Sequence, residues 1–411
     1  MIVAALSAAY GAVATWRRRW YARRPERRYR LTQPVISVGN LRVGGSGKTP
    51  ATAHIARVLL ERGERPVILS RGYARQHAAA GVTVVSDRSR VLTDVAHAGD
   101  EPFLLAHLLP GVPVLVCANR YQAGLEAEAR FSASVHVLDD GFQHVKLARD
   151  IDLLLVDADD LVDRVLPAGR LREPLANASI ADAVITPCVD RDTARSIAVT
   201  LGVADAFIMT RTLGSAVLLS GAGAPSHTAG FSADGLAMHA PESVAAGMAT
   251  DAPGFAASDV VTGAPVFTAA DVATDAPMFA IAGVATDAPV FAVAGIARPE
   301  RFFDDLRTAG VSVCGTQTFA DHHQFSQQDI ARIVDAARAR GATAVVTTEK
   351  DAVRLGSLDT SALPFAAVPL RARIEPADEF SAWLAERLVR ARVQHDVPGT
   401  RASEGRSAVR P

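Results

Sequence analysis

Short runs of apolar residues alternate along most of the chain with segments in which apolar residues recur every three or four positions. The run PVISVGN leads into a glycine-rich loop, and a helical pattern follows with Ala51, Ile55, Val58 and Leu59 on one face. Further apolar runs occur in RPVILSRGYAR, VPVLVCANR, VHVLDDGFQH, IDLLLVDA and ADAVITPC. Strands that are apolar throughout are typical of a parallel sheet with helices on both faces. The pattern therefore predicts an α/β fold that opens with strand, glycine loop, helix and strand.

A different texture, rich in Ala, Gly, Thr, Ser and Pro and poor in charge, extends from about Thr212 to Ala288. Only the last of its repeats, APVFAVAGIARPERFF, continues into a helix-like segment. We interpret the repeat as a tandem duplication of one core strand that leaves the extra copies in a long surface insertion. A solenoid would need helix signals that the copies lack. The twelve-residue period is marked by Pro253, Pro265, Pro277 and Pro289 and by Phe255, Phe267, Phe279 and Phe291.

The alternation of strands and helices returns after the repeat. PVFAVAGIA predicts a strand and RPERFFDDLRTAG a helix, and the loop TFADHHQFS precedes a second helix, QQDIARIVDAARARG. ATAVVTTEKDAVRL predicts another strand, followed by the apolar segment LPFAAVPLRARI. We expect an interfacial helix and basic segment at 1–30, a first α/β domain at 31–212, the insertion at 213–288, a smaller α/β domain at 289–396 and a disordered tail at 397–411.

The N-terminal segment is the most asymmetric part of the chain in charge. Its first sixteen residues are mostly apolar, and RRRWYARRPERRYR follows with eight arginines and one glutamate. A signal peptide carries its charge before the apolar part, and sixteen residues are short for a membrane span of about 20. We expect a helix that lies in the membrane interface, where each basic residue contributes about 1 kcal/mol. An ordinary first helix with a solvated basic end is the alternative, and the aromatic residues among the arginines favour the membrane.

Composition narrows the classes of partner and compartment. With 411 residues, 49% apolar and 21% charged, the chain is long enough for two globular domains with cores of their own. The formal net charge of −1 argues against a nucleic-acid partner. Cys117, Cys188 and Cys314 lie far apart without a C-x-x-C motif. This spacing excludes a disulfide scaffold and a cysteine zinc site, and it suits a reducing compartment.

The glycine-rich loop contains Gly-Lys-Thr but departs from the usual spacing of a phosphate-binding loop. The pattern G-x-x-x-x-G-K-[ST] has a glycine five residues before Gly47, and Arg42 occupies that position. The glycines let backbone N–H groups converge on phosphate oxygens, Lys48 can reach the β- and γ-phosphates, and Thr49 can ligate Mg²⁺. Because the loop lies between a strand and a helix N-terminus, we predict a nucleotide site rather than a chance turn. The predicted nucleotide-binding residues are Arg42, Val43, Gly44, Gly45, Ser46, Gly47, Lys48 and Thr49.

Charged residues that suit a metal ion and phosphate occur in two further motifs. Asp139 and Asp140 end the apolar run of VHVLDDGFQH, and carboxylates at the C-terminal end of a strand suit Mg²⁺ directly or through water. By itself, Asp-Asp-Gly forms a turn as often as a metal site, but beside a phosphate loop it predicts metal coordination. LPAGRLREP offers Arg170 and Arg172 beside Glu173. Their guanidinium groups suit phosphate oxygens, although a solvated surface loop would carry the same residues.

Two motifs offer groups that could move a proton. HAGDEPFLLA places Asp100 and Glu101 before a helix, where capping of the helix N-terminus is the simpler explanation. ADHHQF offers His322 and His323. Adjacent histidines on a loop point apart, so one of them as a proton-handling residue is more plausible than a metal site that uses both.

Taken in order, the motifs resemble those of tetraacyldisaccharide 4'-kinase, the lipid A 4'-kinase of Gram-negative bacteria. The resemblance rests on GNLRVGGSGKTP, SRGYAR, GDEP, DDGFQH, PAGRLREP, AGIARPERF, ADHH and TEKDAVRL. It covers nearly all of the chain outside the repeat and the tail, and the motifs together are highly specific. Members of the family share this altered phosphate loop, so Arg42 does not argue against a nucleotide site.

The resemblance implies a P-loop NTPase-like kinase domain, a smaller C-terminal α/β domain, an active site in the cleft between them and an N-terminal membrane-docking helix. The family uses ATP to phosphorylate the 4'-hydroxyl of tetraacyldisaccharide 1-phosphate, which gives lipid IVA at the cytoplasmic face of the bacterial inner membrane. The expected partners are this lipid and, through residues 1–30, the membrane surface. Neither nucleic acid nor an obligate protein partner is expected.

The family's site residues carry over to matching positions in this chain. Thr49, Asp139 and Asp140 are the expected ligands of Mg²⁺. The expected catalytic residues are Asp100, its dyad partner His322, Lys48, Arg172 and Glu173. The long insertion departs from the family and falls between the motifs of the two domains. We expect it to loop out, so that the dyad can still form.

Two other classes of protein stay open from the residues alone. A membrane-associated P-loop ATPase switch that acts on a protein partner would need neither Asp100 nor His322, and it would hydrolyse ATP without lipid. Val43 stands where the partition-type ATPases carry a signature lysine, which disfavours that subclass. A non-catalytic nucleotide-binding scaffold would bind ATP without turnover.

Overall fold

A nine-stranded, mostly parallel sheet is the larger of two sheets in the computed structural model, which describes residues 2–219 and 287–396 apart from Ser46, Ala74, residues 78–80 and Val189. The inner strands pair parallel, and the edge strands β3 and β14 pair antiparallel with their neighbours. The predicted α/β fold with a parallel sheet is confirmed. In spatial order the strands are β14 (Leu370–Glu375), β8 (Asp205–Leu213), β7 (Ala183–Thr186), β6 (Ile151–Leu155), β1 (Val35–Asn40), β5 (Val135–Asp139), β2 (Pro66–Ser70), β4 (Val114–Val116) and β3 (Thr83–Ser86).

Helices cover both faces of this sheet, which explains why its strands are apolar throughout. In β2, Ile68 joins a core that contains Ile55 of α2 and Phe380 of α10, whereas Leu69 joins a second core with Ala123 of α5. Successive residues of one strand are therefore buried on opposite faces. The helices are α1 (Ile2–Ala22), α2 (Lys48–Glu61), α3 (Val95–Ala98), α4 (Asp100–Leu108), α5 (Arg120–Phe131), α6 (Arg191–Leu201), α7 (Pro299–Thr308), α8 (Gln327–Ala339), α9 (Glu349–Leu355) and α10 (Ala377–Asp396), with short 3₁₀ turns η1 (Pro25–Arg27), η2 (Ala158–Val162) and η3 (Leu175–Ile180).

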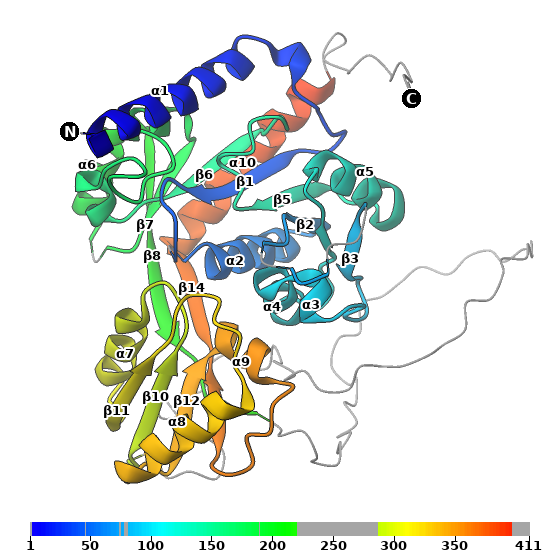
Figure 1. Cartoon of the computed structure of the whole chain (residues 1–411). Helices are drawn as coiled ribbons and strands as arrows, with labels where there is room; N and C mark the ends of the chain where they lie inside the picture. The colour runs from blue at the N-terminus through cyan, green and yellow to red at the C-terminus, as the bar shows by residue number, and fades with distance from the viewer. Residues whose placement is uncertain are drawn as a thin grey trace, which may run out of the picture.

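A second, five-stranded sheet forms a smaller unit at the bottom of Figure 1. Leu306 of α7 and Ile333 of α8 belong to two different cores on this sheet. The fourth copy of the twelve-residue repeat forms its buried strand β10, as predicted. The other copies and the tail from residue 397 lie outside the described residues. In spatial order the strands are β11 (Val313–Thr318), β10 (Val290–Ala294), β12 (Ala344–Thr348), β13 (Phe365–Val368) and β9 (Val217–Leu218).

The long strands β8 and β14 connect the two units. They pair antiparallel, with Ile208 opposite Glu375 at one end and Leu213 opposite Leu370 at the other, and they run between the two sheets in Figure 1. After β13 the chain returns along β14 and adds α10 to the large sheet. Strand pairing thus places β14 in the larger sheet, whereas we expected all of 289–396 in the smaller domain. Hydrophobic periodicity identifies strands but not the strands they pair with.

The segment ATAVVTTEKDAVRL, predicted as one strand, is a strand followed by a helix. β12 ends at Thr348, and α9 begins at Glu349. The Thr348 hydroxyl accepts a hydrogen bond from the backbone N–H of Asp351 at 3.1 Å and donates one to Asp351 Oδ2 at 2.7 Å. T-E-K-D fits the [ST]-x-x-[DE] signature of a helix start. The strand prediction was therefore wrong from Glu349 onward, because this capping signal outweighs the apolar run before it.

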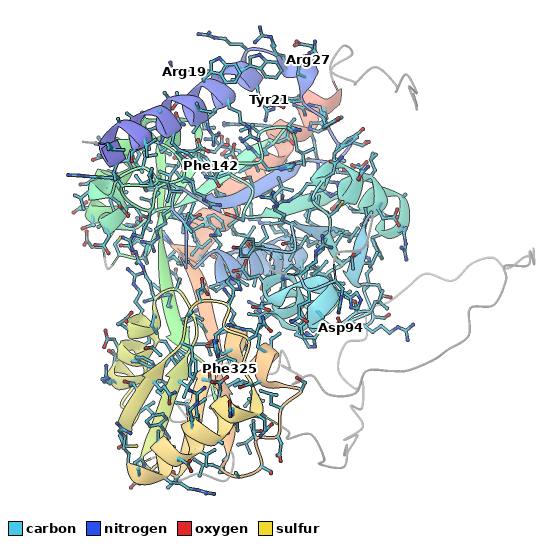
Figure 2. All side chains as sticks on the ribbon, in the orientation of Figure 1. Arg19, Tyr21, Arg27, Asp94, Phe142 and Phe325 are labelled. Atoms are coloured by element: carbon cyan, nitrogen blue, oxygen red, sulfur yellow. The ribbon has the colours of Figure 1, made fainter. Side chains whose placement is uncertain are left out.

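The N-terminal helix α1 lies across the top of the larger unit (Figure 1). Its inward face is small or polar: Gly11 packs against Pro174, and the Arg18 guanidinium lies 4.2 Å from the ring centre of Phe142, which Figure 2 places beneath the helix. Among residues 2–219 and 287–396, no helix has the length and hydropathy needed to cross a bilayer. The large side chains that α1 exposes are those of Ile2, Val3, Leu6, Tyr10, Val13 and Trp16.

Candidate active site

The glycine-rich loop connects the end of β1 to α2 at the centre of the large sheet. Gly44 and Gly47 have φ angles of 97° and 81°, in the left-handed region that favours glycine. Lys48 is the first residue of α2, so the loop ends on a helix N-terminus whose free N–H groups and dipole favour phosphate oxygens. Val43 is exposed on the loop, and Ser46 lies outside the described residues.

Arg42 occupies the position where the common phosphate loop has its first glycine. Its side chain is 1% exposed and forms a salt bridge from Nη1 to Asp160 Oδ1 at 2.9 Å. Its Nη2 donates to the carbonyl oxygen of Gly45 at the same distance. A Cβ atom at Gly44 would lie 3.3 Å from Cβ of Ala297, so the loop also packs closely against the segment that follows β10. The altered spacing is therefore accommodated by an arginine that is buried beside the loop and hydrogen-bonded to its backbone.

Lys48, Asp140 and Arg172 meet at the carboxyl end of β5. Arg172 donates from Nη1 to Asp140 Oδ2 and from Nη2 to Oδ1, both at 2.8 Å, and Lys48 Nζ lies 3.6 Å from Oδ1. Burial opposes the charge of Asp140, but the hydrogen bonds from Arg172 and the charge of Lys48 outweigh it and hold the pKa of Asp140 well below its usual range. Two cations beside one carboxylate leave net positive charge, which suits phosphate oxygens.

Asp139 fits a divalent cation. It is 2% exposed, and one of its oxygens accepts a hydrogen bond from the Thr52 hydroxyl at 3.3 Å. Burial and the carboxylates of Glu101 and Asp140 raise its pKa to about 7. A bound cation would offset this unfavourable charge, and Mg²⁺ prefers carboxylate oxygens. The described part of the chain contains no group of three or more His, Cys, Asp or Glu side chains that could hold a metal ion. Mg²⁺ here would therefore also need the nucleotide's phosphates, which are its usual further ligands.

Asp100 and His322 lie side by side, although 222 positions separate them in the chain. Asp100 is the first residue of α4, and its predecessor Gly99 forms the N-cap without a side-chain hydrogen bond. His322 Nδ1 is 3.0 Å and Arg354 Nε is 3.3 Å from Asp100 Oδ2. Burial disfavours the carboxylate, but the hydrogen bond with His322 and the charge of Arg354 outweigh it and lower the pKa of Asp100. The contacts of Asp100 thus differ from those of a capping residue, and they join the two units.

The motifs do not single out two cationic residues of this site, Lys350 and Arg354. Both belong to α9, a segment that we predicted as part of a strand. Lys350 Nζ lies 3.2 Å from Glu101 Oε1 and 3.3 Å from His322 Nε2. The capping signature in TEKDAVRL could have revealed them, because residues four apart share one face of a helix.

Arg120 is a further cation near the acidic pair that the motifs do not single out, and its charge acts on His144, the last residue of DDGFQH. Arg120 begins α5, is 4% exposed, and its Nε has no hydrogen-bond partner among the described residues. Burial lowers the pKa of Arg120 to about 10, against the opposing charge of Asp140. Burial and the charge of Arg120 lower the pKa of His144 to about 3. Arg120 therefore adds buried positive charge beside the carboxylates at the end of β5, whereas a histidine with the lowered pKa of His144 is neutral near pH 7.

Three other candidate residues have partners of their own. Both oxygens of Glu173 accept hydrogen bonds from Arg18 of α1 at 2.7 Å, so Glu173 connects α1 to the Arg172 segment. Arg170 forms a salt bridge at the surface. His323 Nε2 lies 3.2 Å from Asp329 Oδ2, so the two adjacent histidines face different carboxylates.

Comparison with known proteins gives one consistent result. A family model described as tetraacyldisaccharide-1-P 4'-kinase matches residues 1–389. The tetraacyldisaccharide 4'-kinase of Geobacter metallireducens is 35% identical over 379 residues, which are 91% of this chain and 94% of that protein. The enzyme of the same name from Desulfotalea psychrophila is 35% identical over 373 residues, or 89% of this chain and 90% of that protein.

A solved structure matches almost the whole chain. The crystal structure of LpxK from Aquifex aeolicus in complex with ATP has a TM-score of 0.64 and 28% sequence identity to this chain, and it covers 94% of this chain and 100% of its own. The arrangement of the two sheets therefore occurs in a protein that binds ATP.

Proposed function

The chain belongs to the tetraacyldisaccharide-1-P 4'-kinase family, and on this premise we propose that Asp100 receives the proton of the 4'-hydroxyl of tetraacyldisaccharide 1-phosphate while ATP phosphorylates that oxygen. A bond forms between the 4'-oxygen and the γ-phosphorus, and the bond from that phosphorus to the β–γ bridging oxygen breaks. ADP and lipid IVA are the products. The observation that carries the proposal is the contact of Asp100 with His322. The next residue, Glu101, is close enough to the acidic pair for its charge to raise the pKa of Asp139.

Phosphoryl transfer depends mainly on positioning and on stabilisation of charge. Lys48 and Arg172 neutralise the phosphate oxygens, and Asp140 orients Arg172 through its two hydrogen bonds. Thr49, Asp139 and Asp140 are the side chains that would hold Mg²⁺. The ion would supply further charge stabilisation to the phosphates when bound. Arg42 keeps the loop in shape through the carbonyl oxygen of Gly45, so that its N–H groups face the nucleotide.

The substrate's acyl chains require an apolar approach to this site. A groove of about 1280 Å³ lies between α1 and the segment 163–175, and Gly11, Trp16, Val165 and Leu175 are among its lining residues. The same lining includes Leu171, the neighbour of Arg172. We place α1 at the cytoplasmic face of the bacterial inner membrane, with its arginines on anionic headgroups, so that the lipid reaches Arg172 through the groove.

Transfer of labelled γ-phosphate from ATP to the purified disaccharide lipid tests this function directly. We expect label in the lipid and little release of phosphate when lipid is left out. Hydrolysis at an equal rate without lipid would instead support a membrane-associated ATPase switch, an alternative that the family match does not support. ATP binding without turnover would support a scaffold.

Polar substitutions on the exposed face of α1 should weaken membrane association. In the triple variant Leu6→Ser, Val13→Ser, Trp16→Ser, each replaced side chain is more than half exposed, at 54%, 62% and 64%. We expect binding to anionic vesicles to fall at least about 10²-fold, because each large apolar side chain contributes about 1.5 kcal/mol or more when buried. Cosedimentation with the vesicles measures this binding. The KM for ATP should not change. The substitutions leave Arg18 and its contact with Glu173 in place, which a truncation of residues 1–30 would remove.

The matched control replaces three exposed valines elsewhere. Val199 on α6 and Val389 and Val393 on α10 are 72%, 58% and 62% exposed. Their substitution by serine should leave vesicle binding unchanged. Equal losses in the two triple variants, or full binding by the α1 variant at low and at high salt, would place the membrane contact outside α1.

A further inference from the structure

The ammonium group of Lys350 lies against the imidazole of His322, on the side opposite Asp100. Its Nζ is 3.3 Å from His322 Nε2, whereas His322 Nδ1 is 3.0 Å from Asp100 Oδ2. The same Nζ lies 3.2 Å from Glu101 Oε1 and 3.3 Å from Asp321 Oδ1. One ring nitrogen thus faces a carboxylate, and the other faces a cation that two further carboxylates hold in place. Asp321 Oδ1 lies 3.9 Å from Nε2, which is beyond hydrogen-bond distance, so Lys350 is the nearer group.

The chemistry of these groups decides which ring nitrogen carries the proton. An ammonium group has three donors and no acceptor, so a hydrogen bond between Lys350 and His322 requires Nε2 to accept. Burial opposes the charge of Lys350, but the carboxylates of Glu101 and Asp321 outweigh it and raise the pKa of Lys350. Lys350 therefore stays protonated. An imidazole that accepts a hydrogen bond at Nε2 is neutral and carries its proton on Nδ1.

We infer that Lys350 is a positioning residue that holds His322 as the neutral Nδ1–H tautomer, which leaves Asp100 and not His322 to accept the substrate's proton. The inference rests on the proposed kinase reaction for its role in catalysis. With Nε2 facing Lys350, the histidine has no free basic nitrogen for the sugar hydroxyl. His322 and Arg354 both lie at Oδ2 of Asp100, and Oδ1 makes no hydrogen bond within the described ranges, so Oδ1 is the oxygen left to accept the substrate's proton.

The backbone of His322 supports a defined orientation of the ring. Its φ angle is 60°, in a left-handed region that few residues other than glycine adopt. Such conformations persist where surrounding contacts hold them. The ring also meets the ring of Tyr73 edge to face, with centroids 5.5 Å apart. Asp100, Lys350 and Tyr73 together enclose the imidazole from three sides.

The tautomer can be read by ¹⁵N NMR of the full chain labelled at its 11 histidines, without nucleotide or lipid. The His322 signals are assigned by their loss in His322→Gln. We expect a protonated Nδ1 and an unprotonated Nε2 in the parent protein and in Lys350→Arg, since a guanidinium cannot accept a hydrogen bond either. In Lys350→Met, Nε2 should become protonated, because the cation that faces it is gone. A protonated Nε2 in the parent overturns the inference without any variant.

Kinetics test whether the tautomer matters for transfer. Lys350→Met should lower kcat about 10- to 100-fold, by analogy with partners that orient metal-ligating histidines, with little change in the KM for ATP. Lys350→Arg should restore most of the rate. In a His322→Ala background, Lys350→Met should cost less than about threefold, because a residue that acts through His322 has no further effect once His322 is gone.

Lys146 provides the matched control. The chain has three lysines, at positions 48, 146 and 350, and Lys146 is exposed. Lys146→Met should leave the tautomer and kcat unchanged. Equal losses from Lys350→Met in both backgrounds, or a rise in KM alone, would make Lys350 a direct ligand of substrate and overturn the inference. If the parent protein failed to phosphorylate the lipid, the proposed function would fall while the NMR result still decided the tautomer.

Discussion

Replacing Asp100 with alanine is expected to lower kcat by at least about 10²-fold, the contribution typical of a general base. The carboxylate is 4% exposed and is held between His322 and Arg354 at the boundary of the two units. His322→Ala should cost a similar factor, because it removes the hydrogen bond that orients the carboxylate and helps to keep it ionised. The double variant should lose little more than either single variant, since residues that act as a unit are not additive.

Steady-state transfer to the lipid, measured with ATP and lipid varied separately, checks this prediction. The KM for ATP should stay near the parent value in all three variants, because neither residue belongs to the phosphate loop. A second aspartate–histidine pair supplies the control: His97 Nδ1 lies 2.7 Å from Asp94 Oδ1 on the surface, where Figure 2 marks Asp94. His97→Ala should leave kcat unchanged. If the losses in kcat multiplied in the double variant, the two residues would not act as a dyad. Normal turnover in Asp100→Ala would show that Asp100 is not the general base.

Lys48→Ala should lower kcat on the order of 10²–10³-fold, because it removes a fixed positive charge from the phosphates as their charge is redistributed. Its Nζ lies 3.2 Å from Asn40 Oδ1 and 3.6 Å from Asp140 Oδ1, at the start of α2. The variant should stay folded, since Asp140 keeps its two hydrogen bonds from Arg172.

Labelled phosphate transfer and a thermal melt together check the Lys48 prediction. Lys146→Ala is the control, and it should behave like the parent protein in both measurements. Lys48→Arg should recover only part of the rate, because a planar guanidinium does not replace a compact ammonium in a narrow loop. A melting temperature lowered by more than about 8 °C would attribute the loss of rate to the fold, and a rate within threefold of the parent would exclude Lys48 from charge stabilisation.

Local signals in the sequence predict most of the secondary structure. Apolar runs without alternation mark β1, β2, β5, β6 and β7, and the glycine-rich loop marks the start of α2 at Lys48. The helix α9 was predicted as a strand because the apolar run before it was given more weight than the N-cap signal of Thr348. The order of strands in each sheet could not be predicted in this way, because β8 and β14 pair across more than 150 residues, from Ile208 to Glu375.

Chemistry that depends on neighbours in the chain can be predicted from the order of residues alone. A phosphate loop needs its glycines, Lys48 and Thr49 in one short segment, because the backbone between a strand and a helix forms the site. Contacts that depend on packing become visible only in the folded chain: Arg42 is buried against Asp160, Arg18 binds Glu173, and Lys350 contacts His322. The physical reason is that a side chain's type limits what it can donate or accept, whereas only the packed sheets and helices decide which distant group lies within 3 to 4 Å of it.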